Sequence, residues 1–202
     1  MTVPIDAVKV FHNAFRQDMA GIDAVALGAA RGEPGSRRHW SDSASATRCL
    51  WCTLSGEEIA VFPALEEVAP LVAEAYEKDH RGLDAAFDAL NDAVSAGDAL
   101  ATARATAAFK FYLDIHLFKK DTHLYRIFAE RVPVPDRGKA VGIMAAQMPP
   151  ERQPEFIAWP FPLIGDGDRE NMLRIQRMVL PPRRSRESRS SYGEQSATTG
   201  RS

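Results

Sequence analysis

Four side chains able to bind a metal ion stand on or beside the apolar faces of four predicted helices: His12, Glu57, His80 and His116. A single buried imidazole is usually a core histidine with a hydrogen-bond partner. Four helices that each supply such a group at a similar depth are a different case, because an unpaired buried carboxylate or imidazole costs several kcal/mol. The pattern therefore predicts that these side chains hydrogen bond or coordinate an ion inside a helical bundle.

The last of these helices carries a second carboxylate, Asp121, five residues after His116 in the stretch "HLFKKD". Residues five apart in an α-helix are about 140° out of phase, so this pair shares an ion only if it straddles the inner face. Imidazole nitrogens and carboxylate oxygens suit iron, manganese or zinc. Di-iron carboxylate sites in helical bundles are built from such ligands.

The segments that must position these side chains have helical patterns. Alanine, leucine and charged residues dominate, and alternating runs of β-branched residues are few, which favours helices over strands. Cap, glycine and proline signals place the four helices at about residues 6–32, 41–62, 70–97 and 98–132. Four long helices with short connections most economically form an antiparallel bundle.

The sequence thus predicts an all-α protein with three regions. Residues 1–132 form the antiparallel four-helix bundle, residues 133–180 form a C-terminal helical extension packed on it, and residues 181–202 form a disordered tail rich in Arg and Ser. The chain has 202 residues, 45% of them hydrophobic, which is enough for a substantial core.

Charge and hydropathy exclude several function classes. The formal net charge is −2 at pH 7, and outside the Arg-rich tail the chain has no basic face of the kind that nucleic acid requires. The N-terminus lacks a charged leader followed by a long apolar core, and no run reaches about 18 apolar residues. We expect a cytoplasmic protein that binds neither nucleic acid nor membrane. The oligomeric state stays open.

The only cysteines, Cys49 and Cys52, form a C-x-x-C pair in a helical setting. A zinc site needs two further ligands at matching spacing, which the chain does not offer, so the preferred interpretation is two half-buried thiols. The alternative is that Cys49, which lies two turns before Glu57 on the same helix face, is a redox-active or ligating thiol.

Four stretches together resemble the motifs of one family. "FHNAFRQDM" resembles a first-helix His motif, "TLSGEEIAVFPAL" the H-H-x-x-E-[DE]-x-x-[LV]-F-P-x-L motif, "EKDHRGLDAAFDAL" a third-helix E-x-x-H, and "YLDIHLFKKD" the final H-L-x-x-[EDH]-[ED]. On these motifs, which cover about residues 6 to 130, the chain resembles the hemerythrin-like, HHE cation-binding domains. The resemblance implies a four-helix bundle that holds non-heme iron, with two ions in complete sites.

Carried over by position, the resemblance implies the metal ligands His12, Glu57, His80, His116 and Asp121, with Asp84 and Glu58 as secondary candidates. The implied cofactor is one or two iron ions. The implied partners are a small diatomic ligand or peroxide.

The departures from the family pattern limit what the centre can hold. Thr53 and Leu54 stand where the family has paired histidines, and Lys119 and Lys120 stand where members often have a histidine and an acid. A lysine near the inner face opposes a divalent cation and can instead neutralise an acid such as Glu57 in an ion pair. A symmetric oxygen-binding di-iron centre is therefore disfavoured, while a single metal, an asymmetric pair and no metal stay open.

Three functions follow, in order of preference. The first is a hemerythrin-like metal-binding protein that senses oxygen, peroxide or nitric oxide or handles iron. The second is a metal-free bundle that serves as an interaction or structural protein, which an inward Lys120 bound to Glu57 would favour. The third is a non-heme iron oxidase or oxygenase, which an access pocket beside Thr53 would favour.

Overall fold

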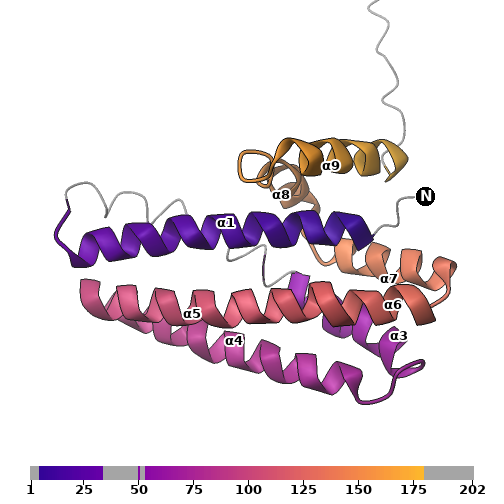
Figure 1. Ribbon diagram of the computed structural model, residues 1–202, viewed down its shortest axis with the longest axis horizontal. Coiled ribbons are helices and arrows are strands. Elements are labelled where there is room, and N and C mark those ends of the chain that lie inside the picture. Colours follow the sequence, from indigo (N-terminus) through magenta and orange to yellow (C-terminus); the bar gives the residue numbers. More distant parts are fainter. Residues whose placement is uncertain (1–4, 34–49, 51–52, 180–202) are drawn as a thin grey trace, which may run out of the picture.

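The computed structural model describes residues 5–33, residue 50 and residues 53–179 (Figure 1). Every regular element within these residues is a helix, and none of them is a strand, which confirms the all-α prediction. No helix in this part of the chain is long and apolar enough to cross a membrane. Cys49, Cys52 and the predicted tail at 181–202 lie outside the described residues.

Three long helices form the centre of the fold: α1 (Ile5–Ala30), α4 (Val72–Ser95) and α5 (Ala99–Lys119). Helix α5 packs against both others, and Figure 1 shows α1 and α4 on opposite sides of it. Their apolar faces meet in one buried cluster, which includes Phe15, Met19, Ile22, Leu83, Leu90, Phe109, Leu113 and Leu117. Burial of these side chains supplies the main driving force for the packing.

The ends of the long helices follow the sequence signals. Gly32 adopts a positive φ of 77° after α1, and Gly97 adopts 69° after α4, a conformation that glycine reaches without steric cost. The Asp98 carboxylate caps α5 by accepting a hydrogen bond of 2.9 Å from the Ala101 amide. Helices α1 and α4 therefore begin and end within a few residues of the predicted positions, whereas the predicted fourth helix is divided into α5 and two further helical segments that end at Arg131.

Two π-helical turns interrupt the helical segments, one before α4 and one after α5. They are η2 (Glu57–Val61), between helical residues 53–56 and α3 (Phe62–Glu66), and η3 (Lys120–Leu124), between α5 and α6 (Tyr125–Arg131). In each turn the backbone bonds across five residues: Phe62 N–H donates to the Glu57 carbonyl, and Tyr125 N–H donates to the Lys120 carbonyl. Such turns often mark functional sites.

The turn at η2 changes the predicted end of the second helix. The sequence places this end at Pro63, because proline lacks an amide donor and clashes with the preceding turn. In the structure Pro63 lies in the first turn of α3, directly after η2, and the helix continues to Glu66. The wider π turn takes up the break, so proline does not end the helix here.

The remaining helices cover the outside of the long ones. They are α7 (Val134–Ala146), η4 (Pro150–Arg152), α8 (Gln153–Ala158) and α9 (Asp166–Val179). Helix α7 packs against η2, and α9 lies along α1 (Figure 1). Two side-chain hydrogen bonds join this region to α1: Trp159 Nε1 donates to Asp18 at 3.2 Å, and Asn13 Nδ2 donates to Asp168 at 2.9 Å.

Gly56 allows the close approach of α7 to the turn that carries Glu57. A Cβ added at Gly56 would lie 2.6 Å from the Met144 Cγ and 3.0 Å from the Met144 Cα. The first of these atoms can move with its side chain, but the second belongs to the α7 backbone. The absence of a side chain at Gly56 therefore sets how closely α7 packs on this segment.

We predict that Gly56→Ala lowers the free energy of unfolding by about 1–3 kcal/mol, because α7 must shift away. Gly82→Ala is the matched control, since a Cβ at Gly82 in α4 meets nothing within 4 Å. That change should raise the free energy of unfolding by about 0.5–1 kcal/mol through helix propensity. Urea denaturation followed by circular dichroism measures both, and equal effects of the two substitutions would contradict the packing argument.

Candidate metal centre

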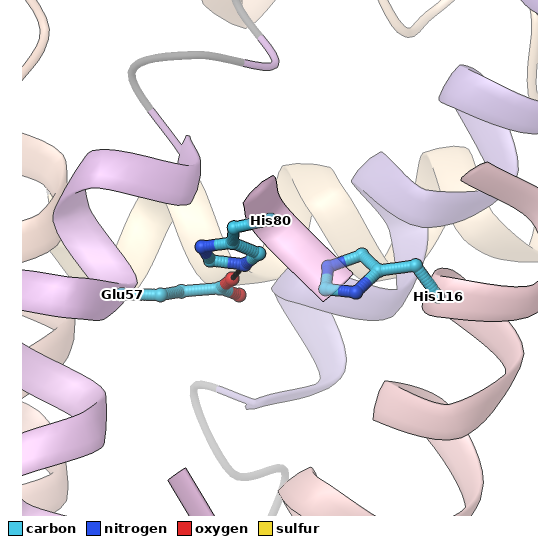
Figure 2. Close-up of side chains that lie close together, drawn as sticks. All are labelled: Glu57, His80 and His116. Carbon is cyan, nitrogen blue, oxygen red and sulfur yellow. Dashed lines mark ion pairs between the residues drawn. The ribbon is translucent and has the colours of Figure 1, made fainter. Parts of the chain in front are cut away.

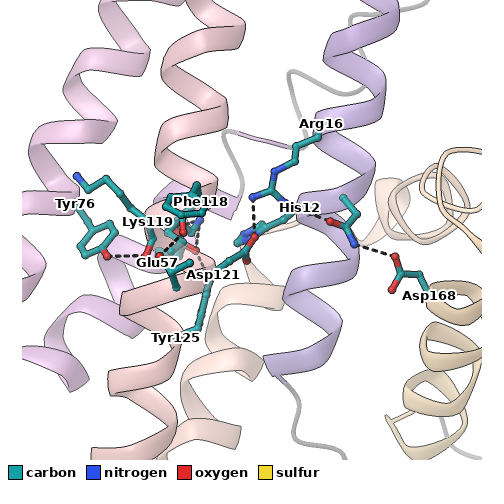
Figure 3. Close-up of polar contacts among 12 residues, drawn as sticks. His12, Arg16, Glu57, Tyr76, Phe118, Lys119, Asp121, Tyr125 and Asp168 are labelled. Atoms are coloured by element: carbon teal, nitrogen blue, oxygen red, sulfur yellow. Dashed lines mark hydrogen bonds and ion pairs between the residues drawn. The ribbon is translucent and has the colours of Figure 1, made fainter.

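A buried ion pair joins the two π turns. Glu57 is the first residue of η2 and Lys120 the first of η3, and both side chains are fully buried. The Lys120 ammonium lies 2.6 Å from Glu57 Oε1 and 2.7 Å from Oε2. The Tyr125 hydroxyl also donates a hydrogen bond to Oε1, and Figure 3 shows Tyr125 directed at this carboxylate.

These contacts determine the protonation states of Glu57 and Tyr125. Burial alone would raise the pKa of Glu57, but the Lys120 ammonium, with help from His80 and His116, outweighs burial and holds that pKa far below its usual range. Burial and the adjacent Glu57 carboxylate raise the pKa of Tyr125 well above its usual value. At neutral pH, Glu57 is thus an ionised acceptor and Tyr125 a protonated donor.

Three predicted ligands from three helical segments converge beside this pair. One ligand atom each from Glu57, His80 and His116 lies within 4.8 Å of the other two, and all three side chains are buried. Figure 2 shows them directed toward a common point, with the His80 Nε2 3.5 Å from Glu57 Oε2. Two imidazoles and one carboxylate form a donor set that suits a divalent transition metal.

The imidazoles in this region keep nitrogen atoms without partners. Among the described residues, the buried atoms His12 Nε2, His80 Nε2 and both ring nitrogens of His116 have no hydrogen-bond partner. Buried polar atoms are nearly always satisfied by protein, ordered water or an ion. Ordered water or an ion can therefore satisfy these nitrogens.

Each of these imidazoles also has a carboxylate near its Nδ1 atom, as a hydrogen bond for His12 and His80 and as a longer ion-pair contact for His116. The Glu58 carboxylate lies 2.7 Å from His80 Nδ1, and the Asp121 carboxylate lies 2.7 Å from His12 Nδ1. Asp79 makes a longer contact of 3.5 Å with His116 Nδ1 and also pairs with Lys119. A carboxylate at Nδ1 favours the tautomer whose proton is there, so the Nε2 lone pair remains available, as in metal-ligating histidines.

The seven candidate ligands divide into distinct environments. Glu57, His80 and His116 come together as described. His12 is buried beside Tyr125, with ring centroids 5.7 Å apart, and lies outside that group of three.

The other carboxylates are placed differently. Asp121 contacts His12 and, at 2.7 Å, the Arg16 guanidinium (Figure 3). Glu58 contacts His80, and Asp84 is exposed on α4. For these residues the ligand assignment stays a prediction.

Sequence reasoning missed Asp79 and Tyr125. Asp79 precedes His80 and faces α5, a position that the helical pattern alone does not distinguish from a solvated surface acid. Tyr125 follows Lys120 by five residues, which in a regular α-helix places the two side chains on different faces. Only the π turn at η3 brings both to Glu57, and the sequence carries no reliable signal for such a turn.

Comparisons of the chain with protein-family models, with curated proteins and with solved structures give no match. The hemerythrin-like resemblance therefore stays a prediction from motifs. What the chain does must be inferred from the side-chain geometry of this centre.

Burial makes the centre sensitive to acid. Burial, followed by the Lys120 ammonium, lowers the pKa of His12 from 6.5 to about 4. Burial likewise lowers the pKa of His116 to about 4. Between pH 6.5 and 4 the unfolded chain therefore binds protons that the folded protein does not, so stability falls as the pH falls through this range.

We predict that the lowered pKa of His12 alone reduces the free energy of unfolding by an amount on the order of 2 kcal/mol when the pH falls from 7 to 5. His12→Gln should remove this share of the pH dependence. Met19→Leu, a buried non-titrating change on the same helix, should keep it. Urea denaturation at both pH values in the presence of a chelator measures the slopes, and an equal slope for wild type and His12→Gln would contradict the prediction.

Proposed function

We propose that the protein binds a single divalent metal ion, most suitably iron, through Glu57, His80 and His116. The observation that carries this proposal is the set of unpartnered buried nitrogens on His80 and His116, which face an ionised carboxylate. Two neutral imidazoles and one carboxylate are the donor set of many non-heme iron proteins, and they leave coordination positions open for small molecules. The residues present therefore fit such an ion.

The surrounding residues support the same proposal. The carboxylates of Glu58 and Asp79 lie at the Nδ1 atoms of His80 and His116 and orient the rings, as second partners of metal-bound histidines do. Lys120 keeps Glu57 ionised and able to donate lone pairs to a cation, since a carboxylate has about four acceptor sites. These residues prepare the donor atoms before any ion arrives.

The helical arrangement agrees with a hemerythrin-like bundle, which we propose as the architecture of residues 1–132. Each of four helical segments supplies one group to the same region: His12 from α1, Glu57 from η2, His80 from α4 and His116 from α5. This is the distribution expected when a centre is built inside a bundle from facing helices.

Burial favours a small reactant over a bulky substrate. Glu57, His80 and His116 are 0%, 2% and 1% exposed. A diatomic molecule or peroxide needs little space beside such an ion, whereas an organic substrate needs a pocket at the ligands. We therefore infer sensing of oxygen, peroxide or nitric oxide, or iron handling, rather than oxidation of a larger substrate.

A second candidate function rests on the ion pair itself. Because Lys120 contacts both oxygens of Glu57, the carboxylate is neutralised without a metal. In this alternative the protein is a metal-free bundle with a structural or interaction role, and water satisfies the unpartnered imidazole nitrogens. The two candidates differ in whether the wild-type protein binds a divalent ion at all.

We predict that protein reconstituted anaerobically with Fe²⁺ retains about one equivalent after desalting. His80→Ala removes one of three ligands and should weaken Fe²⁺ binding by at least about 100-fold. Asp79→Asn should weaken it by roughly 10–100-fold, because Asp79 orients the His116 ring. Elemental analysis and competition with a chromophoric chelator measure occupancy and affinity.

Two controls accompany this experiment. Asp92→Asn on α4 and His123→Gln change exposed residues outside the group of three and should leave the affinity for Fe²⁺ unchanged. Absence of iron in the wild-type protein would favour the metal-free candidate. Equal weakening by Asp92→Asn and Asp79→Asn would contradict the assignment of Asp79 to His116.

A further inference from the structure

Lys120 holds Glu57 in the way that a bound cation would. Its ammonium is fully buried and lies 2.6 Å and 2.7 Å from the two carboxylate oxygens. A metal ion held by a bidentate carboxylate has the same arrangement at somewhat shorter distances, about 2.0–2.6 Å. The lysine thus supplies a unit of positive charge at a position between the oxygens where a cation can sit.

Further donor groups surround this ammonium. It lies 5.8 Å from the centroid of the Tyr125 ring, and the same ring lies 5.7 Å from that of His12. The positive charge of Lys120 is close enough to contribute to the lowered pKa of both His12 and His116. The ammonium is therefore placed among groups from α1 and α5, with the unpartnered Nε2 of His12 in the same buried region.

We propose that Lys120 is a built-in cation that fills a second cation position of the centre and so limits it to one metal ion. Without the lysine side chain, Glu57 would offer its vacated oxygens and His12 its free Nε2 to a second divalent ion. The inference rests on the proposed function for the first ion, held by Glu57, His80 and His116.

The local backbone explains why a lysine reaches this position. Lys120 begins the π turn η3, and Tyr125, whose amide closes that turn, also donates its hydroxyl to Glu57. An ammonium neutralises the buried carboxylate permanently and independently of metal supply. A neutral side chain here would leave Glu57 as an uncompensated buried charge, which costs about 3–5 kcal/mol unless another cation enters.

The test is the stoichiometry of Co²⁺ binding, followed by equilibrium dialysis and by the visible absorption of the bound ion. Wild-type protein should bind about one equivalent. Lys120→Ala, which frees the position, and Lys120→His, which keeps volume and adds a ligand, should each bind about two. Lys110→Ala is the matched control, because the half-buried Lys110 on α5 pairs with Asp114 instead of Glu57, and this variant should bind about one.

Folding is checked by circular dichroism with and without Co²⁺. If Lys120→Ala folds only when Co²⁺ is present, the proposal is supported, because the ion then replaces the missing charge. Lys120→His provides the measurement if Lys120→Ala does not fold under either condition, since an imidazolium can still pair with Glu57.

The outcomes separate this inference from the proposed function. One equivalent in wild type and one in both Lys120 variants overturns the inference and leaves the proposed function intact. No ion in wild type but one or more in a Lys120 variant overturns the proposed function and supports the lysine as the replacement for a cation. No ion in any protein overturns both.

Discussion

The ion pair between Glu57 and Lys120 is the interaction on which the rest of the centre depends, because neither charge is tolerable alone in this environment. Both side chains are fully buried, and removal of one partner from such a pair costs about 3–5 kcal/mol. The pair links η2 to η3 and fixes the position of the Tyr125 hydroxyl. It also keeps a negative charge beside His80 and His116, which orders the donor atoms of the candidate metal centre.

Much of the fold follows from the sequence, because its long helices have strong local signals. The apolar positions of α1, the Asp98 cap and the glycines after α1 and α4 each act through neighbouring residues, so they can be recognised without knowledge of the packing. The same reasoning places a helix end at Pro63. In the structure the helix continues to Glu66, because the π turn η2 directly precedes Pro63.

The site follows from the sequence only in part, because the two π turns change which residues face inward. In regular helical geometry His116 and Asp121 are about 140° out of phase and share an ion only if they straddle the inner face, and the direction of Lys120 stays open. With η3 beginning at Lys120, the lysine reaches Glu57, while Asp121 contacts His12 and Arg16 on α1. Residue types identified the buried groups, but their pairing depends on tertiary packing that no local pattern encodes.

The charge inventory around the imidazoles explains why one added cation is a better fit than two. The carboxylates near the imidazoles are Glu57, Glu58, Asp79 and Asp121, and the cationic side chains that pair with these carboxylates are Arg16, Lys119 and Lys120. If the imidazoles carry no charge, these four negative and three positive charges sum to −1. One divalent ion changes this net charge to +1, whereas two would change it to +3, and like charges repel. Because the excess charge is larger with two ions than with one ion or none, the charges around a centre that keeps Lys120 oppose a second divalent ion.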